Sequence, residues 1–330
     1  MREFGYERAL DVPGAVAVLG ADPEARFLGG GTNLVDLMKA GVERPARLVD
    51  VRELPLDRIE PTGDGGLRIG ATVTNSDLAA HPEVRLNYPA LSQAVLAGAS
   101  GQLRNMATVA GNLLQRTRCG YFTDVSKPCN KRVPGSGCPA LAGEHRNHAI
   151  LGASEACVAV HPSDMGVALA AFDAVVHYET AEGAGELSLA DFYCPVGDTP
   201  HLETALPSGA LITSVTLPPA PVAARSRYRK VRERASYAFA IGSVAAALDV
   251  QDGVVRDVRL AFGAVASRPW RARAAERALI GSPADGASFA AAADAELAAA
   301  SPLEQNAYKL PLIRNLVVAM LTELSEETAR

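Results

Sequence analysis

Four cysteines in one short stretch offer the clearest chemistry in this chain. Cys119, Cys129, Cys138 and Cys157 follow the spacing C-x9-C-x8-C-x18-C. The spacing lacks both the C-x2–4-C pairs of structural zinc sites and the compact C-x2-C-x2-C run of ferredoxins. Four thiolates nevertheless match the ligand number of a [4Fe–4S] cluster, which a long irregular loop can enclose. From spacing alone, a cluster, unrelated buried thiols and a zinc site all remain open.

Basic residues surround these cysteines. They are Arg116, Arg118, Lys127, Lys131 and Arg132. Positive charge would offset the charge of a thiolate-ligated cluster, and we expect it to lower the pKa of the thiols. The fifth cysteine, Cys194, stands apart between Tyr193 and Pro195, and we interpret it as a spare thiol.

A glycine-rich turn occurs early in the chain, in the motif Phe27-Leu28-Gly29-Gly30-Gly31-Thr32-Asn33-Leu34. Glycines leave backbone N–H groups open to a phosphate and can adopt positive φ. A helix that starts directly behind them adds positive dipole, which suits a pyrophosphate. The spacing is neither GxGxxG nor a Walker loop. A phosphate site and a simple tight turn therefore both remain open.

Two further motifs carry polar groups beside small residues. Ala107-Thr108-Val109-Ala110-Gly111-Asn112 offers a hydroxyl and an amide that could bond phosphate or flavin heteroatoms, although such a segment is more often a plain loop. His161-Pro162-Ser163-Asp164 opens a helix, so Asp164 is either a helix cap or a carboxylate for a ribityl or ribose hydroxyl.

Alternating bases mark a later strand, Tyr228-Arg229-Lys230-Val231-Arg232-Glu233-Arg234. Such a strand usually presents a solvated face, but one base could reach a phosphate or the electron-rich edge of a flavin. No Ser-His-Asp set, HExxH motif or paired carboxylates stand out, and the six histidines are scattered. We therefore predict no catalytic residue in this chain.

The composition is that of an ordinary globular protein. The chain has 330 residues, 48% hydrophobic and 21% charged, with a net charge of −5. This balance suggests neither nucleic-acid nor membrane partners, and no segment has the roughly twenty apolar residues of a membrane span. The N-terminal segment is charged and lacks the apolar core of a signal peptide. We therefore expect synthesis and folding in the cytoplasm, with reduced thiols.

The pattern of elements predicts an α+β protein. We expect a helix at Leu34–Lys39 after the glycines, a helix at Tyr88–Ser100 ended by Gly101, and an Ala-rich helix that ends at Phe172. Apolar runs predict strands, among them Leu48–Val51, Leu67–Ala71, Ala156–Val160 and Leu211–Leu217. Residues 111–147 lack periodicity and are too long for an ordinary connection, which indicates function. After the proline-rich boundary at 218–221, strands precede three helices.

The order of the motifs is far more specific than any one of them. GGGTNL, ATVAGNLLQ, HPSDM and YRKVRERASYAFA follow one another along the chain. In this order, across essentially the whole length, the chain resembles the FAD-binding subunits of the xanthine dehydrogenase family of molybdenum hydroxylases. The cysteine segment, about fifty residues between AGN and the Ser-Asp pair, is similar to the branch found in bacterial aldehyde oxidoreductases of the periplasmic type.

The resemblance implies a fold and its domains. Residues 1–223 would form a two-lobed FAD-binding domain of the PCMH type, which is vanillyl-alcohol-oxidase-like, with a [4Fe–4S] insertion at about 113–160. Residues 224–330 would form the small C-terminal α+β domain of carbon-monoxide-dehydrogenase flavoproteins.

The resemblance also assigns cofactor roles to matching positions. The pyrophosphate of FAD would lie against Gly29, Gly30, Gly31, Thr32, Asn33 and Leu34. Thr108, Gly111 and Asn112 would continue that site, and Asp164 would bond the ribityl region. Lys230 would lie near the isoalloxazine, with Arg229 as the alternative at that position. The four clustered cysteines, Cys119, Cys129, Cys138 and Cys157, would ligate the [4Fe–4S] cluster.

The implied function is electron transfer within an oxidoreductase that acts on an aldehyde or an N-heterocycle. Partners would be a molybdenum-cofactor large subunit and a [2Fe–2S] small subunit in a heterotrimer, and electrons would leave to an external acceptor. The assembled protein would stay cytoplasmic or reach the periplasm by co-export with a partner. The alternatives are an autonomous FAD-dependent oxidase of related fold and a non-enzymatic Fe–S scaffold protein.

Overall fold

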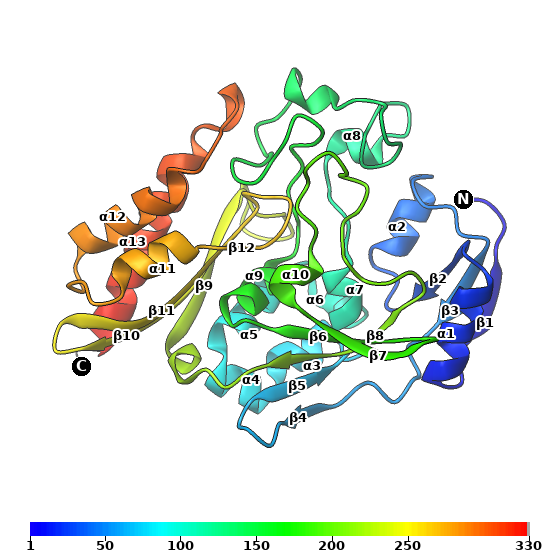
Figure 1. Cartoon of the computed structure of the whole chain (residues 1–330), viewed down its shortest axis with the longest axis horizontal. Coiled ribbons are helices and arrows are strands. Elements are labelled where there is room, and N and C mark those ends of the chain that lie inside the picture. The colour runs from blue at the N-terminus through cyan, green and yellow to red at the C-terminus, as the bar shows by residue number, and fades with distance from the viewer. Residues whose placement is uncertain (329–330) are drawn as a thin grey trace.

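The computed structural model describes residues 1–328, and this part of the chain contains three β-sheets (Figure 1). The N-terminal lobe holds a parallel sheet with the order β1-β3-β2. Its elements are β1 (Gly5–Arg8), α1 (Val12–Ala21), β2 (Ala25–Leu28), α2 (Leu34–Lys39) and β3 (Arg47–Asp50). Parallel strands require crossover connections, so the chain must leave the sheet after β2 before it returns as β3. The glycine-rich turn lies at that exit.

The second lobe is built on an antiparallel sheet with the order β4-β5-β8-β6-β7. The strands are β4 (Ile59–Pro61), β5 (Leu67–Gly70), β6 (Val175–Thr180), β7 (Gly183–Ser188) and β8 (Leu211–Leu217). The helices of this lobe are α3 (Asn75–Ala80), α4 (Pro82–Asn87), α5 (Pro89–Ala97), α6 (Gly101–Arg104), α7 (Val109–Leu113), α9 (Asp164–Ala171) and α10 (Leu189–Phe192). Buried side chains of β5, β8, α5 and α9 form the largest hydrophobic core.

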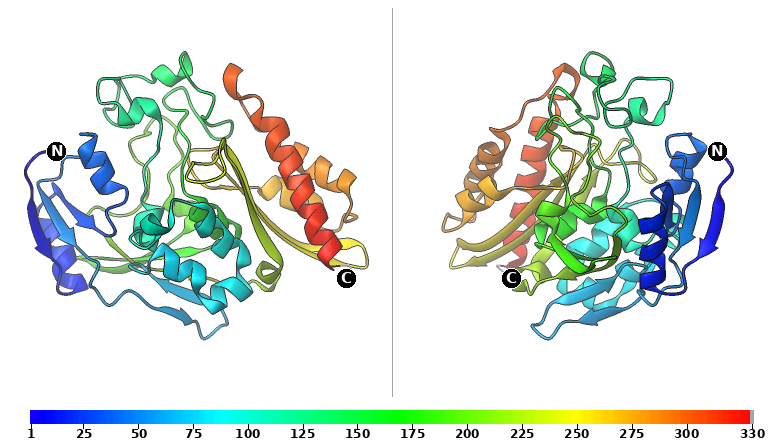
Figure 2. Two further views of the ribbon diagram at one scale, coloured as in Figure 1. Left: turned by 180° about the vertical axis from the view of Figure 1, so that it is seen from behind. Right: turned by 45° about the vertical axis from the view of Figure 1, so that its right-hand side comes forward.

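The C-terminal part is an antiparallel sheet with the order β12-β11-β10-β9, covered by helices on one face (Figures 1 and 2). Its elements are η2 (Pro221–Arg225), β9 (Ser226–Val231), β10 (Gly242–Gln251), β11 (Val254–Gly263), β12 (Trp270–Arg271), α11 (Arg273–Leu279), α12 (Gly286–Leu297), η3 (Glu304–Asn306) and α13 (Lys309–Thr328). Along β10, Val244, Ala246 and Leu248 pack on the helices. The alternate residues Ala245 and Ala247 join the core of the second lobe, so β10 is buried on both faces over this stretch.

The cysteine segment crosses the top of the molecule in Figure 1 with little regular structure. It contains only α8 (Gly120–Thr123) and η1 (Pro139–Leu141) among the described elements. Ile150 and Leu151 enter the C-terminal core, and both of their backbone N–H groups donate to the carbonyl of Val265. The insertion is therefore anchored on the C-terminal part although it interrupts the second lobe.

The elements expected from sequence are mostly found, with two exceptions. Helix α2 and strand β8 have the expected bounds. The expected strand Ala156–Val160 is wrong, because this segment is a buried loop whose pairing is limited to a single bridge between Ser154 and Cys157. Gly101 does not end the preceding helix. Helix α5 ends at Ala97, and Gly101 begins α6, which the hydroxyl of Ser100 caps.

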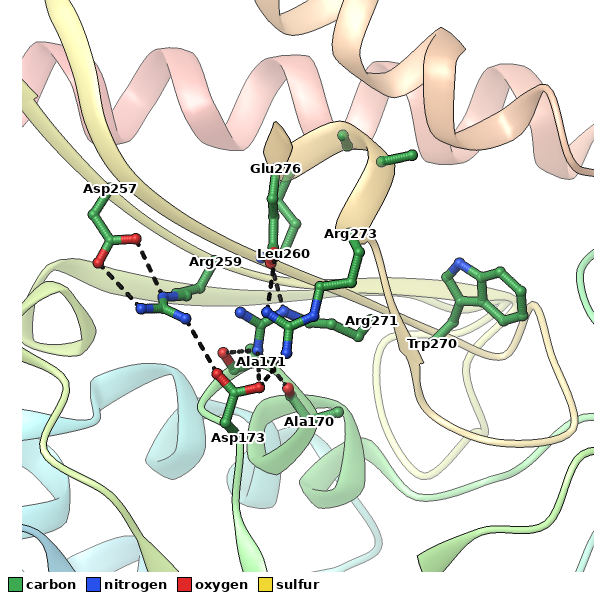
Figure 3. Close-up of polar contacts among 12 residues, drawn as sticks. Ala170, Ala171, Asp173, Asp257, Arg259, Leu260, Trp270, Arg271, Arg273 and Glu276 are labelled. Atoms are coloured by element: carbon green, nitrogen blue, oxygen red, sulfur yellow. Dashed lines mark hydrogen bonds and ion pairs between the residues drawn. The ribbon is translucent and has the colours of Figure 1, made fainter. Parts of the chain in front are cut away.

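An ion-pair cluster joins the second lobe to the C-terminal part (Figure 3). Asp173, just after α9, accepts from Arg259 of β11 at 3.1 Å, from Arg271 of β12 at 3.2 Å and from Arg273 of α11 at 2.5 Å. The side chain of Arg271 is only 10% exposed and also pairs with Glu276 at 2.5 Å. A buried cation is costly unless it is paired, so Asp173 is central to this junction.

We expect Asp173→Asn to lower the free energy of unfolding by about 1–3 kcal/mol, since the arginines lose a charged acceptor. Asn suits this test because Asp173 has a φ of 53°, and Asn tolerates the left-handed region. Urea unfolding would measure the change. Asp252→Asn is the matched control: Asp252 has a φ of 52° and no ion pair with any described residue. Equal stability of both variants would contradict the prediction.

Candidate cofactor site

Two cavities meet at the glycine-rich turn. The first, of about 630 Å³, extends from the turn toward residues 200–210. The second, of about 580 Å³, extends toward Asp164 and Lys230. Both are lined by Gly31, Thr32 and Asn33. This arrangement suits an elongated ligand whose middle lies on the turn and whose two ends occupy separate cavities.

The glycines are required by close approach of two backbone segments. A Cβ on Gly30 would lie 1.7 Å from the carbonyl oxygen of Met106, and one on Gly29 would lie 2.9 Å from Oγ1 of Thr108. Gly31 has a φ of 73°, which favours glycine. The turn therefore packs directly on the segment that leads into Ala-Gly-Asn, and the two predicted binding motifs form one surface.

Asn33 presents an unused donor at the junction of the cavities. Its Oδ1 accepts from the backbone N–H of Arg116 at 3.0 Å. Its Nδ2 is buried and has no hydrogen-bond partner among the described residues. A buried donor without an acceptor is costly, and a phosphate oxygen would supply one. The donor set at this point therefore fits a pyrophosphate.

Thr108, Gly111 and Asn112 hold the second motif in place. Oγ1 of Thr108 caps α7 by accepting from the N–H of Gly111 at 3.2 Å. Oδ1 of Asn112 accepts from Ser163 at 2.6 Å and from Gln115 at 2.7 Å. The hydroxyl of Thr108 and the amide oxygen of Asn112 thus fix the loop geometry, while Gly111 lines both cavities.

Asp164 and Lys230 form a buried pair in the second cavity. Oδ2 of Asp164 accepts from Nζ of Lys230 at 2.8 Å, and their side chains are 8% and 4% exposed. Oδ1 accepts from the hydroxyl of Tyr228 at 2.5 Å. Burial raises the pKa of Asp164, and the ammonium of Lys230 opposes that shift. Burial and the charge of Asp164 raise the pKa of Tyr228, which keeps its hydroxyl protonated as a donor.

Lys230 and Arg229, the two candidates for the flavin contact, point to opposite faces of strand β9. Tyr228 and Lys230 face Asp164, whereas Arg229 points away and pairs with Glu323 of α13 at 2.7 Å. Lys230 lines the second cavity and Arg229 does not. Sequence reasoning missed Tyr228, although the i, i+2 spacing from Lys230 on a predicted strand could have indicated it.

The four clustered cysteines line one small cavity. Cys129 and Cys157 are buried, Cys119 and Cys138 are half-buried, and the described residues form no disulfide. Within residues 1–328, no three His, Cys, Asp or Glu side chains are close enough to hold a single metal ion. The cavity that the four thiols share has a volume of about 10 Å³. Cys194 instead lines the first of the two larger cavities.

The expectation that nearby bases lower the thiol pKa values is wrong for two of the cysteines. Burial raises the pKa of Cys119, and it raises the pKa of Cys157 to about 11. Burial outweighs the nearby bases: Lys131 lowers the pKa of Cys157 without offsetting the effect of burial, and three of the bases have other partners. Arg116 pairs with Glu43 and Glu203, Arg118 pairs with Asp36 at 2.6 Å, and Lys131 donates to the carbonyl of Pro200 at 2.9 Å. Ligation at these thiols would therefore have to displace protons.

His161 is a buried neutral imidazole beside the cavities. Its ring packs on Tyr193 with centroids 4.7 Å apart, and its Nδ1 accepts from the N–H of Ser163 at 3.3 Å. Burial, together with the charge of Lys131, lowers its pKa from 6.5 to about 3. The unfolded chain therefore binds a proton between pH 6.5 and 3 that the folded chain does not bind.

This pKa shift predicts acid sensitivity. Stability due to His161 is complete above pH 6.5 and decreases as the pH falls, by about 2 kcal/mol at pH 5. We expect His161→Phe to show a smaller difference in the free energy of urea unfolding between pH 7.5 and pH 5 than the parent protein. An equal difference in the two proteins would contradict this prediction.

Comparison with known families identifies the class of protein. Residues 2–220 match the family model described as the FAD binding domain in molybdopterin dehydrogenase. Residues 226–324 match the CO dehydrogenase flavoprotein C-terminal domain. The chain therefore belongs to the FAD-binding subunits of the molybdenum hydroxylase family and is a subunit of an oxidoreductase.

One relative is similar along the whole chain. The FAD-binding subunit of an aldehyde oxidoreductase of Escherichia coli is 55% identical over 326 residues, which cover 98% of each chain. This similarity confirms the family resemblance inferred from the motifs.

Two solved structures confirm the fold. The quinoline 2-oxidoreductase of Pseudomonas putida 86 gives a TM-score of 0.77 at 22% identity, covering 100% of this chain and 99% of that one. The carbon monoxide dehydrogenase of Hydrogenophaga pseudoflava gives 0.76 at 25% identity and covers 98% of both chains. No helix in residues 1–328 is long and apolar enough to cross a membrane.

Proposed function

We propose that this chain is the FAD- and [4Fe–4S]-binding electron-transfer subunit of a molybdenum-dependent aldehyde oxidoreductase. It receives electrons from [2Fe–2S] clusters of a partner and delivers them to an external acceptor. The observation that carries the proposal is the pair of cavities joined at the glycine turn, with the unpartnered Nδ2 of Asn33 at the junction.

The shape of the paired cavities supports one orientation of FAD. The pyrophosphate would lie against residues 29–34, with Thr108, Gly111 and Asn112 behind it. Asp164 would bond the ribityl chain and Lys230 would hold the isoalloxazine end, since both residues line the second cavity. When bound, FAD supplies two-electron acceptance and stepwise electron release, which no side chain provides. The division into domains at residues 223 and 224 would place Lys230 on the C-terminal domain and Asp164 on the FAD-binding domain.

We assign the cluster to the cavity that the cysteine segment encloses. Cys119, Cys129, Cys138 and Cys157 would be its ligands, since all four line that cavity. A [4Fe–4S] cluster supplies one-electron exchange. Lys131 lines the same cavity, and its side chain, which carries a positive charge, is 7% exposed.

The whole-length relative supports the existence of partner subunits, because its name is that of one subunit of an aldehyde oxidoreductase. We propose a heterotrimer with a molybdenum-cofactor large subunit and a [2Fe–2S] small subunit, located in the cytoplasm or exported folded with a partner. No catalytic residue for the organic substrate is assigned to this chain.

The test compares the isolated chain with the co-expressed complex. Both should show flavin absorbance at about 450 nm, but an aldehyde added without oxygen should bleach the flavin only in the complex. Bleaching of the isolated chain by the aldehyde would support an autonomous oxidase. Absence of flavin from both preparations would support an iron–sulfur scaffold protein.

A further inference from the structure

A histidine contacts one of the four clustered thiols. Nε2 of His148 lies 3.2 Å from Sγ of Cys119, and the ring lines the same cavity as the cysteines. Its other nitrogen, Nδ1, is buried and has no partner among the described residues. A proton on Nδ1 would be an unpaired buried donor, so we infer the tautomer in which Nε2 carries the proton and donates to sulfur.

The backbone of His148 is held by the C-terminal part of the chain. Nζ of Lys309 donates to the carbonyl of His148 at 2.9 Å and to that of Ala264 at 2.7 Å. Nδ2 of Asn306 donates to the carbonyls of His148 at 3.3 Å and of Ala149 at 3.1 Å. Lys309 and Asn306 are both 0% exposed. The N–H groups of a fully buried Nζ require acceptors, and these two carbonyls supply them for Lys309.

A second contact fixes the start of the same loop. The N–H of His145 donates to Oε1 of Gln305 at 3.0 Å, and the N–H of Gln305 donates to Nε2 of His145 at 3.1 Å. Residues 305–309 therefore hold the loop 145–149 at both ends. The His148 ring is therefore held against Cys119 by hydrogen bonds from a segment about 160 residues further along the chain.

We propose that His148 is a positioning residue of the thiolate site, which donates Nε2–H to Sγ of Cys119 and is held there by residues 305–309. The proposal rests on the [4Fe–4S] assignment above. Hydrogen bonds to ligand sulfur raise the reduction potential of a cluster because they stabilise its more negative, reduced state. Sγ of Cys157 also accepts a hydrogen bond, from the backbone N–H of Ala159 at 3.4 Å. A side-chain substitution cannot remove this backbone donor, whereas substitution of His148 removes the donor to Cys119.

His148→Phe tests the hydrogen bond in the co-expressed complex, by iron content and by a redox titration followed by EPR. We expect iron to be retained and the midpoint potential of the cluster to become more negative. His148→Gln, which keeps an N–H donor, should restore the parent potential. His177→Phe is the matched control, because His177 lies on β6 and bonds Thr216; it should change neither quantity.

Other outcomes would overturn the proposal in distinguishable ways. An unchanged potential in His148→Phe with full iron would show that the contact has no effect on the site. Loss of iron from both His148 variants, with the His177 control intact, would show that the ring is needed to retain the metal, which contradicts a role limited to the potential. Lys309→Met leaves the His148 ring intact. If residues 305–309 position that ring, this substitution should also make the potential more negative. An unchanged potential would exclude the positioning role of residues 305–309. A parent complex without iron would refute the cluster assignment itself.

Discussion

Replacing Gly30 by alanine should leave a folded chain that binds FAD about 10–100-fold more weakly. The new Cβ would lie 1.7 Å from the carbonyl oxygen of Met106. That oxygen belongs to backbone, so no side-chain rotation can relieve the clash. The glycine turn must move away from the segment 106–108 at a cost of about 1–3 kcal/mol. Because both cavities share this turn, the displacement would disturb the place where the two halves of the ligand join.

The measurement is a fluorescence titration of FAD-free protein with FAD, with a thermal melt to show that the variant is folded. Gly20→Ala provides the matched control, because a Cβ on Gly20 of α1 has no neighbour within 4 Å. The control should bind FAD like the parent protein. Parental affinity in Gly30→Ala would show that the ligand does not depend on this turn.

Local sequence signals predicted the turn well. Three consecutive glycines before an apolar helix allow few interpretations, and helix α2 begins at Leu34 as expected. The contact with Met106 could not be predicted, since it joins segments more than seventy residues apart that share no pattern. The sequence indicated a need for glycine at this turn, but the backbone contact that explains it required the fold.

Burial was easier to predict than conformation. The run from Ala156 to Val160 is apolar and largely buried, as a strand would be. Its backbone groups instead bond scattered partners, such as the N–H of Ala149 with the carbonyl of Val158. An apolar run indicates that a segment is inside the protein, and short runs leave its conformation open. Polar pairs between distant elements, such as Asp164 with Tyr228, also cannot be predicted from local sequence patterns.

The loop around Cys129 is largely shaped by its own hydrogen bonds. The N–H of Cys129 donates to Oγ of Ser136 at 2.9 Å, and its carbonyl accepts from Arg132 at 3.0 Å and Val133 at 2.8 Å. These bonds fix the turn between the second and third cysteines. The four thiols, by contrast, form no covalent link with one another. Hydrogen bonds already join this turn to its neighbours, since Asn130 Nδ2 donates to the carbonyl of Ala156 at 2.9 Å and Arg132 donates to that of Tyr121 at 2.9 Å. Ligation would add a further link.

We expect Cys129→Ser to reduce iron from about four atoms per chain to a small fraction of that value and to lower the thermal unfolding midpoint of the complex. A serine hydroxyl is a poor substitute for the thiolates that hold such clusters, and the loop would lose one of the links between its turns. Metal analysis and EPR of anaerobically purified protein measure the result. Cys194→Ser is the matched control, since Cys194 lies outside the cysteine cavity. Full iron in Cys129→Ser would remove this residue from the ligand set, and stoichiometric zinc without iron in the parent protein would make the site a zinc site.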